Sequence, residues 1–236
     1  MDDTKTSVRI NKYLAHRGIA ARREADRLIE RGFVFINGTR AKLGSRVLNG
    51  DTVTISGPQR RYTYLAYHKL GGVVTHSARP NEKEIPNTFM VGGRKVKVFP
   101  LGRLDKDSSG LIILTNDGRI TDRLLNPKFG HSKTYEVTLD KPVQNRLLKE
   151  MRRGMRIERD VAKPARAERC GPCTLRITLS EGKKHQIRRM CAALGYRVTS
   201  LRRVRIENVP LGKIPPGGWS EIKEKDRTEL LKKLGL

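Results

Sequence analysis

Apolar residues in the first sixty positions follow a helical spacing and then an alternating one. The helical spacing predicts one helix before Gly18 and a second before Gly32, on the apolar positions Ile10, Leu14, Ala15, Ala25, Leu28 and Ile29. Residues 33–36 form an apolar run that meets Asn37-Gly38, a strong hairpin signal, and residues 51–55 alternate like a further strand. The pattern predicts a compact unit of two short helices and a small sheet, ended by the turn-forming residues 56–61.

The rest of the chain carries more strand patterns than helical ones. Apolar runs predict strands at residues 62–68, 96–99, 111–115, 134–139 and 174–179. Helical spacing predicts helices at 119–126, 143–153, 183–194 and, at the C-terminus, 229–234. Because the two kinds of element do not alternate strictly, we expect an α+β domain with a mixed, mainly antiparallel sheet flanked by helices. The predicted domains are residues 1–57 and 62–236, with a linker at 58–61.

The charge of the chain narrows the class of partner. Its 236 residues include 50 Lys and Arg against 24 Asp and Glu, a formal net charge of +26. Such an excess repels itself unless a polyanion screens it, so we expect a nucleic-acid partner. No apolar run approaches the roughly 18 residues of a membrane-spanning helix, and residues 1–4 do not open a signal peptide. We therefore expect a cytoplasmic protein with no membrane partner.

The cations are densest in one segment. Between Lys183 and Arg205, eight Lys or Arg occur without an Asp or Glu, which favours a binding surface because a solvated face normally mixes charges of both signs. In the predicted helix 183–194, one face is apolar and another carries Lys184, His185, Arg188 and Arg189. Gly182 precedes this helix, whose free N-terminal N–H groups would suit a phosphate.

The N-terminal unit contains an ordered set of short motifs. They are Arg9-Ile10-Asn11-Lys12-Tyr13-Leu14-Ala15, Gly18, Arg22-Arg23-Glu24-Ala25 and Ile36-Asn37-Gly38. This order is similar to the S4 RNA-binding domain over nearly the whole length of that domain. The resemblance implies that the two helices present basic side chains to structured RNA, with the candidates Arg9, Arg17, Arg22, Arg23 and Arg27. The alternative is that Arg23, Glu24 and Arg27 form solvated surface pairs.

A polar loop lies between two apolar stretches at residues 99–118. It contains Arg103, Asp105, Lys106, Asp107 and Ser108, and the strand predicted at 111–115 follows it. Strands on both sides would hold a reactive carboxylate in a fixed place. By residue type alone, however, a carboxylate between two cations is more often a local ion pair than a catalyst. The loop alone leaves both interpretations open.

Five motifs in a fixed order favour the interpretation of this loop as catalytic. They are His68-Lys69 with Gly72-Val73, Gly102-Arg103-Leu104-Asp105 with Ser109-Gly110 and residues 114–118, Lys133-Thr134-Tyr135, residues 184–190, and Gly217-Gly218-Trp219. Together they resemble the RsuA-type family of ribosomal RNA pseudouridine synthases with an N-terminal S4 domain. The resemblance covers practically the whole chain and leans toward a large-subunit member of that family. Leu70 departs from it, since proline is usual at that position.

The resemblance implies a reaction and its catalytic residues. The reaction converts a uridine in ribosomal RNA, with 23S RNA favoured, to pseudouridine. It needs no cofactor, because there is no net redox change and no group donor. Asp105 is expected to act at C1′, as a nucleophile or as the stabiliser of a glycal intermediate. Tyr135 is expected to pack on the uracil and to take the C2′ proton if a glycal forms, and Arg188 to pair with Asp105.

A stacked uridine cannot reach a buried carboxylate, so the target nucleotide must be flipped out of the RNA. Arg103, whose guanidinium is planar, is the residue expected to fill the vacated stack. Lys106 is expected to hold a phosphate, and Lys184, His185 and Arg189 to contact RNA. The expected partner is ribosomal RNA or a ribosomal assembly intermediate, bound by a monomer.

Other interpretations use different features of the chain. Cys170-Gly171-Pro172-Cys173 copies a thioredoxin tetrapeptide, but no Trp precedes it and a strand pattern follows, which disfavours redox catalysis. A zinc site would lack a second cysteine pair, and the odd number of cysteines favours reduced thiols. The rival from another class is a non-catalytic S4-domain RNA-binding or ribosome-assembly factor. A DNA-binding protein is disfavoured, because no helix-turn-helix or zinc motif is visible.

Overall fold

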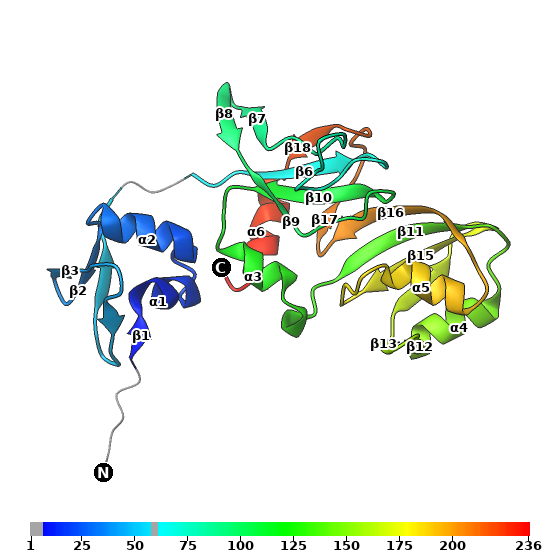
Figure 1. Ribbon diagram of the computed structural model, residues 1–236, viewed down its shortest axis with the longest axis horizontal. Helices are drawn as coiled ribbons and strands as arrows, with labels where there is room; N and C mark the ends of the chain where they lie inside the picture. The colour runs from blue at the N-terminus through cyan, green and yellow to red at the C-terminus, as the bar shows by residue number, and fades with distance from the viewer. Residues whose placement is uncertain (1–6, 58–60) are drawn as a thin grey trace, which may run out of the picture. The chain divides into compact units, whose positions relative to one another are not determined.

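The computed structural model describes residues 7–57 and 61–236. These residues fall into two compact units (Figure 1). The first holds the residues up to Tyr62 together with 117–122 and 235–236, and the second holds 63–116 and 123–234. The predicted linker at 58–61 lies mostly outside the described residues, so the predicted domain boundaries stay a prediction.

The first unit combines two helices with short strands. α1 (Ile10–His16) and α2 (Arg22–Glu30) share one buried apolar cluster with β2 (Val34–Ile36), which pairs with β3 (Thr39–Arg40) and β5 (Val53–Ile55). A second pair is formed by β1 (Val8–Arg9) and β4 (Arg46–Val47). The turn between β2 and β3 has positive φ at Asn37 (50°) and Gly38 (79°), as a two-residue hairpin turn of this type requires. The predicted helices and hairpin are confirmed.

The second unit is built on a mixed sheet (Figure 1). Its order is β14 (Arg166–Arg169), β15 (Thr174–Leu179), β11 (Lys133–Leu139), β16 (Val198–Ile206), β10 (Ser109–Thr115), β6 (Tyr64–Lys69) and β18 (Trp219–Glu221). In addition, β9 (Phe99–Leu101) pairs with β10, and β17 (Val209–Pro210) with β16. β10 and β16 run parallel and the other pairs of this sheet are antiparallel, which confirms the predicted fold class.

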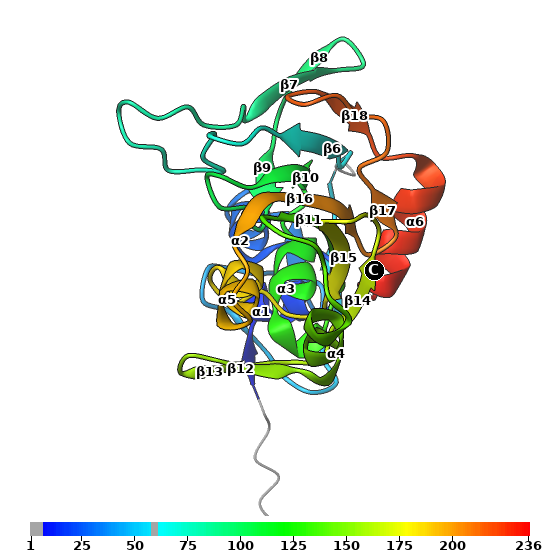
Figure 2. The same ribbon diagram turned by 90° about the vertical axis from the view of Figure 1, so that its right-hand side faces the viewer.

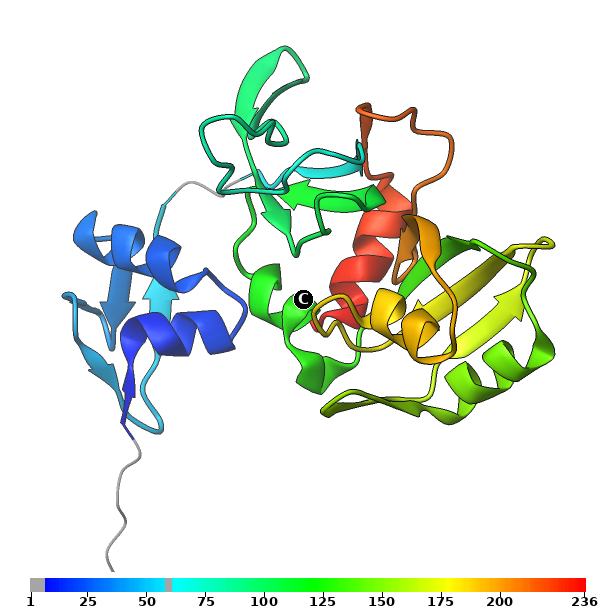
Figure 3. The same ribbon diagram turned by 45° about the vertical axis from the view of Figure 1, so that its right-hand side comes forward.

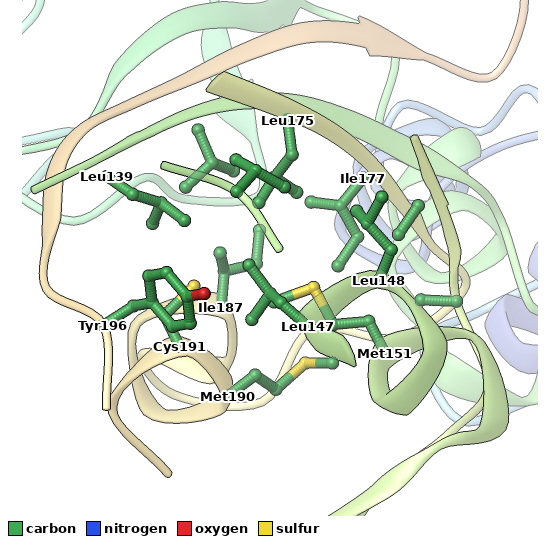
Figure 4. Packing of buried hydrophobic residues seen from close by; sticks show 14 of the residues in the cluster. Leu139, Leu147, Leu148, Met151, Leu175, Ile177, Ile187, Met190, Cys191 and Tyr196 are labelled. Atoms are coloured by element: carbon green, nitrogen blue, oxygen red, sulfur yellow. The ribbon is translucent and has the colours of Figure 1, made fainter. Parts of the chain in front are cut away.

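Helices pack on different parts of this sheet. α5 (Gln186–Ala193) lies beside β16 and α6 (Glu224–Lys233) beside β17, and the two helices appear on opposite sides of the central strands in Figure 2. α4 (Asn145–Arg153) and α5 bury apolar side chains against β11 and β15, and the cluster in Figure 4 includes Leu139, Leu147, Leu148, Met151, Leu175, Ile177, Ile187, Met190 and Cys191. α3 (Ile120–Leu125) leads into the 3₁₀ turn η1 (Pro127–Phe129). Within 7–57 and 61–236, no helix is long and apolar enough to cross a bilayer.

Two hairpins extend from this unit. β7 (Thr88–Val91) and β8 (Arg94–Lys97) form one, seen as the projecting teal-green ribbon in Figure 3, and Phe89 anchors it edge-on against Tyr67 and Trp219. β12 (Met155–Ile157) and β13 (Asp160–Ala162) form the other. The single strand predicted at 96–99 is wrong, because β8 pairs within its hairpin whereas β9 joins the edge of β10.

The basic stretch 183–205 also differs from the expectation. α5 begins at Gln186, because His185 adopts a left-handed backbone with φ 50°, so Lys183, Lys184 and His185 lie in the loop before the helix. The helix N-terminus predicted to follow Gly182 is therefore displaced. No strand was expected at 198–206, yet β16 lies inside the sheet and buries Arg203. The stretch is thus not one continuous binding surface.

Candidate active site

Asp105 lies in a short loop that connects β9 to β10. Leu104 is buried in the apolar core beside it, and the N–H of Ser108 donates to the carbonyl of Asp105 at 3.0 Å. The loop thus starts from a side chain fixed in the core and closes on itself in a tight turn. The carboxylate itself is partly open to solvent, with 39% of the side chain exposed, so it is accessible to a substrate.

A buried lysine holds this loop and the neighbouring turn by hydrogen bonds to their backbone carbonyls. Lys69 is fully buried, and its Nζ donates to the carbonyl oxygens of Leu70 (2.8 Å), Val73 (2.6 Å) and Lys106 (3.0 Å). Three acceptors match the three N–H donors of an ammonium group. Burial lowers the pKa of Lys69 to about 8, against the opposing attraction of Asp105 and Asp107, so the group is charged at neutral pH. The turn at Leu70, the position that departs from the family motif, is therefore built around this ammonium.

A cavity of about 740 Å³ lies next to Asp105. Residues from six separate segments line it. Among them are six predicted site residues: Arg103, Asp105, Lys106, Tyr135, Lys184 and His185. Tyr135 comes from β11, where it pairs in register with Ile177 and Arg203. The fold therefore brings the predicted carboxylate, the predicted tyrosine and several cations to one hollow of the size of a small-ligand site.

The side chain beside Asp105 is that of His185 and not that of Arg188. The Nδ1 atom of His185 lies 3.2 Å from Oδ2 of Asp105, which is an ion pair when the imidazole is protonated. Arg188 instead donates through Nη1 to the carbonyl of Val198 at 3.3 Å. The structure does not pair Arg188 with Asp105. The left-handed backbone at His185 starts α5 at Gln186, three residues after the start predicted at 183. The role of Arg188 stays a prediction.

Arg189, predicted to contact RNA, is held by acidic residues of the β12–β13 hairpin. Its guanidinium donates to Asp160 (2.8 Å) and lies 3.1 Å from Glu158, and the hydrogen bond lowers the pKa of the Asp160 carboxyl. Lys106 likewise pairs with Glu82 at 2.9 Å, and this hydrogen bond lowers the pKa of Glu82. A phosphate would have to compete with these carboxylates for either cation.

A buried arginine behind the loop was not expected from the sequence. Arg203 is only 2% exposed, and it donates through Nε to the carbonyl of Leu111 (2.7 Å) and through Nη1 to that of Arg103 (3.4 Å). It therefore ties β16 to β10 and to the start of the Asp105 loop. The available signal was the alternation in residues 198–206, which the high density of arginine concealed.

The five predicted arginines of the first unit are all exposed. Arg9, Arg17, Arg22, Arg23 and Arg27 present their side chains to solvent, and Arg17 also lies over the ring of Tyr13, with its Cζ 5.5 Å from the ring centroid. Exposure is compatible with RNA contact and with a solvated surface alike. Their individual roles stay a prediction.

The cysteine tetrapeptide forms the turn between β14 and β15. The N–H groups of Cys170 and Gly171 both donate to the carbonyl of Thr174, and both cysteines are free thiols. Burial raises the pKa of Cys170, which is the opposite of what a reactive thiolate needs. In the described part of the chain, no cluster of three or more His, Cys, Asp or Glu is arranged to hold a metal ion.

Comparison with known proteins decides the family. Residues 63–193 match the family described as RNA pseudouridylate synthase, and residues 8–53 match the S4 domain. The chain belongs to the RNA pseudouridine synthase family. As such it is an isomerase, and its S4 domain binds RNA. This confirms the predicted resemblance and the predicted enzyme class.

The relatives of this pseudouridine synthase cover nearly its whole length. It is 41% identical over 235 residues to the dual-specificity RNA pseudouridine synthase RluF of Salmonella typhi, covering 97% of this chain and 80% of the relative. It is 32% identical to the ribosomal large subunit pseudouridine synthase B of Bacillus subtilis, over 83% and 84% of the two chains. A crystal structure of a pseudouridylate synthase matches with a TM-score of 0.67 and 30% identity, over 96% of this chain and 99% of the other.

Proposed function

We propose that this synthase converts a uridine of 23S ribosomal RNA to pseudouridine, with Asp105 as its catalytic carboxylate. The observation that carries the proposal is the shared cavity, in which Asp105 and Tyr135 meet although they come from segments 30 residues apart along the chain. The substrate class is supported by the large-subunit activity in the name of the Bacillus subtilis relative. The protein acts as a monomer on the RNA or on an assembly intermediate that contains it.

The reaction rearranges bonds within one nucleotide. The N1–C1′ bond breaks, the uracil turns, and a C5–C1′ bond forms, while the proton on C5 is lost and N1 gains one. Asp105 acts at C1′, either by forming a covalent ester or by stabilising a glycal, and Tyr135 packs on the uracil. In the glycal route Tyr135 takes the C2′ proton. No electrons are gained or lost overall, so the proposal requires no redox cofactor.

The cations around the cavity fit the flipping of a nucleotide. Extrusion from folded RNA costs a few kcal/mol, which contacts between cations and phosphates can offset. Arg103 and Lys184 are exposed at the cavity, which makes them candidates for such contacts. In this proposal Arg103 fills the vacated stack. His185 holds the Asp105 carboxylate, which is a role different from the RNA contact predicted for it.

The test compares Asp105→Asn with Asp107→Asn. Asp107 is an exposed carboxylate two residues further along, outside the cavity lining, so it controls for the loss of one negative charge in the same loop. Pseudouridines are mapped in ribosomal RNA from cells without the protein, with wild type and with each variant. We expect Asp105→Asn to abolish one or more 23S pseudouridines while RNA binding survives, and Asp107→Asn to retain them.

Three outcomes would count against parts of the proposal. If Asp105→Asn still formed pseudouridine, the assigned carboxylate would be wrong. If the missing pseudouridine lay in another RNA, the substrate would be wrong although the activity stood. If the loss of the protein caused a defect that Asp105→Asn fully repaired, the main role of the protein would be that of a non-catalytic assembly factor.

A further inference from the structure

The backbone on both sides of Asp105 is tied to the segment 69–75. On one side, the Thr75 hydroxyl donates to the carbonyl of Leu104 (3.0 Å) and accepts from the N–H of Leu104 (3.1 Å). On the other side, the carbonyl of Lys106 accepts from the N–H of Gly72 (2.8 Å) and from Nζ of Lys69 (3.0 Å). The two residues that flank Asp105, Leu104 and Lys106, are therefore both hydrogen-bonded to the segment 69–75.

Thr75 makes its two hydrogen bonds out of reach of solvent. It is 2% exposed and Leu104 is 8% exposed, so water cannot easily replace the hydroxyl on either backbone group. The backbone of the preceding residue, Val74, is also fixed by hydrogen bonds. Its N–H donates to the carbonyl of Lys83 (2.8 Å), and its carbonyl accepts from the N–H of Ile85 (3.1 Å). Because the Thr75 backbone is fixed, the two hydrogen bonds of its hydroxyl also fix the backbone of Leu104, the residue before Asp105.

We infer that Thr75 is a positioning residue for Asp105, acting through its hydroxyl on the Leu104 peptide. The inference rests on the proposed function of Asp105. Catalysis needs the carboxylate within attack distance of C1′, and a misplacement of about 1 Å can cost about a hundredfold in rate. Thr75 also lines the cavity wall, so a shift in this segment would alter the site at the carboxylate.

The main test is Thr75→Val, which keeps the branched shape and removes the hydroxyl. We expect kcat to fall about tenfold to a hundredfold, because Leu104 loses the partner of both its backbone groups and Asp105 loses its place. The KM for RNA should stay the same, because the exposed cations are untouched. Thr75→Ser should restore most of the lost kcat, since it keeps the hydroxyl and lacks only the methyl group.

Thr115→Val serves as the matched control. The Thr115 hydroxyl donates to the carbonyl of Thr63 at 2.6 Å, near the opposite end of β10 from the Asp105 loop, and Thr115 is also fully buried. This variant should lose stability comparably and keep its kcat. If Thr75→Val behaved like Thr115→Val, with lowered stability and an unchanged kcat, Thr75 would be merely structural and the inference would be overturned.

The assay follows the hydrogen lost from C5. Ribosomal RNA labelled with 5-tritiated uridine, from cells that lack the protein, releases tritium once per isomerisation, and single-turnover measurement isolates the chemical step. If Thr75→Val does not fold, judged by circular dichroism, Thr75→Ala measured at low temperature replaces it. A full kcat in that variant would overturn the inference equally.

The design separates this inference from the proposed function. If wild type released no tritium, or Asp105→Asn retained the activity, the proposed function would fail and the inference would fall with it. If wild type were active and Asp105 essential, while loss of the Thr75 hydroxyl left kcat intact, only the inference would fail. Loss of kcat in Thr75→Val with rescue by Thr75→Ser would support it.

Discussion

Gly110 is a position in the sheet where the neighbouring backbone leaves no room for a Cβ atom. It lies in β10 with φ 108°, in parallel register with Arg203 of β16. A Cβ at this position would lie 2.3 Å from the carbonyl oxygen and 2.6 Å from the nitrogen of Arg203. Both atoms belong to the backbone of a paired strand, so neither can swing aside. We therefore expect Gly110→Ala to be strongly destabilising.

The magnitude follows from two separate costs. Overpacking a rigid site costs about 1–3 kcal/mol, and holding a side chain at such a φ costs about 1–3 kcal/mol more. The sum, about 2–6 kcal/mol, is a large share of the roughly 5–15 kcal/mol that a folded protein has in total. Gly93→Ala is the matched control, since Gly93 has φ 74° but nothing within 4 Å of an added Cβ. It should lose only the backbone cost of about 1–2 kcal/mol.

Urea unfolding followed by tryptophan fluorescence measures this difference. The chain has one tryptophan, Trp219 in β18, and β18 pairs with β6 next to β10, so its emission reports on this sheet. We expect a lower midpoint for Gly110→Ala with little change in slope. If Gly110→Ala lost no more stability than Gly93→Ala, the close approach of β10 and β16 would be refuted.

Two further predictions concern buried titratable groups. Burial lowers the pKa of Lys69 from 10.5 to about 8, so between these values the unfolded chain binds more protons and the stability from this group rises with pH. The unfolding free energy of wild type minus that of Lys69→Met should therefore increase from pH 8 to 10.5, and parallel pH curves would contradict it. Burial raises the pKa of Cys191 to about 12, so native protein should react with maleimide at the exposed Cys170 and leave Cys191 unlabelled by mass spectrometry. Rapid labelling of Cys191 before unfolding would show that the core around α5 opens.

Local patterns predicted most of the regular elements correctly. The Asn37-Gly38 turn, the apolar run at 111–115 and the helical spacing at 143–153 correspond to the β2–β3 hairpin, β10 and α4. These signals work because turn geometry and the burial of one face depend on neighbouring residues. The motif order likewise led to the correct family, because each motif is a short local string.

Local sequence patterns did not predict β16 or the position at which α5 begins. Three arginines in residues 198–206 mask the strand alternation. Arg203 is stable inside the fold because it donates hydrogen bonds to the carbonyls of Leu111 and Arg103. The left-handed backbone at His185 was equally hidden. A buried charge is stable only if its partners are present, and these partners are about a hundred residues away in sequence.

Residue patterns predicted the fold class, and the resemblance of short ordered motifs to a known family predicted the family and the candidate carboxylate. The folded chain was needed to show that His185 lies beside Asp105, that Arg188 donates to Val198, that Arg189 pairs with Asp160, and that Thr75 bonds Leu104. These pairings are set by strand register and by one unusual backbone angle. Hydrogen bonds and ion pairs depend on distances of a few tenths of an ångström, which residue spacing along the chain does not specify.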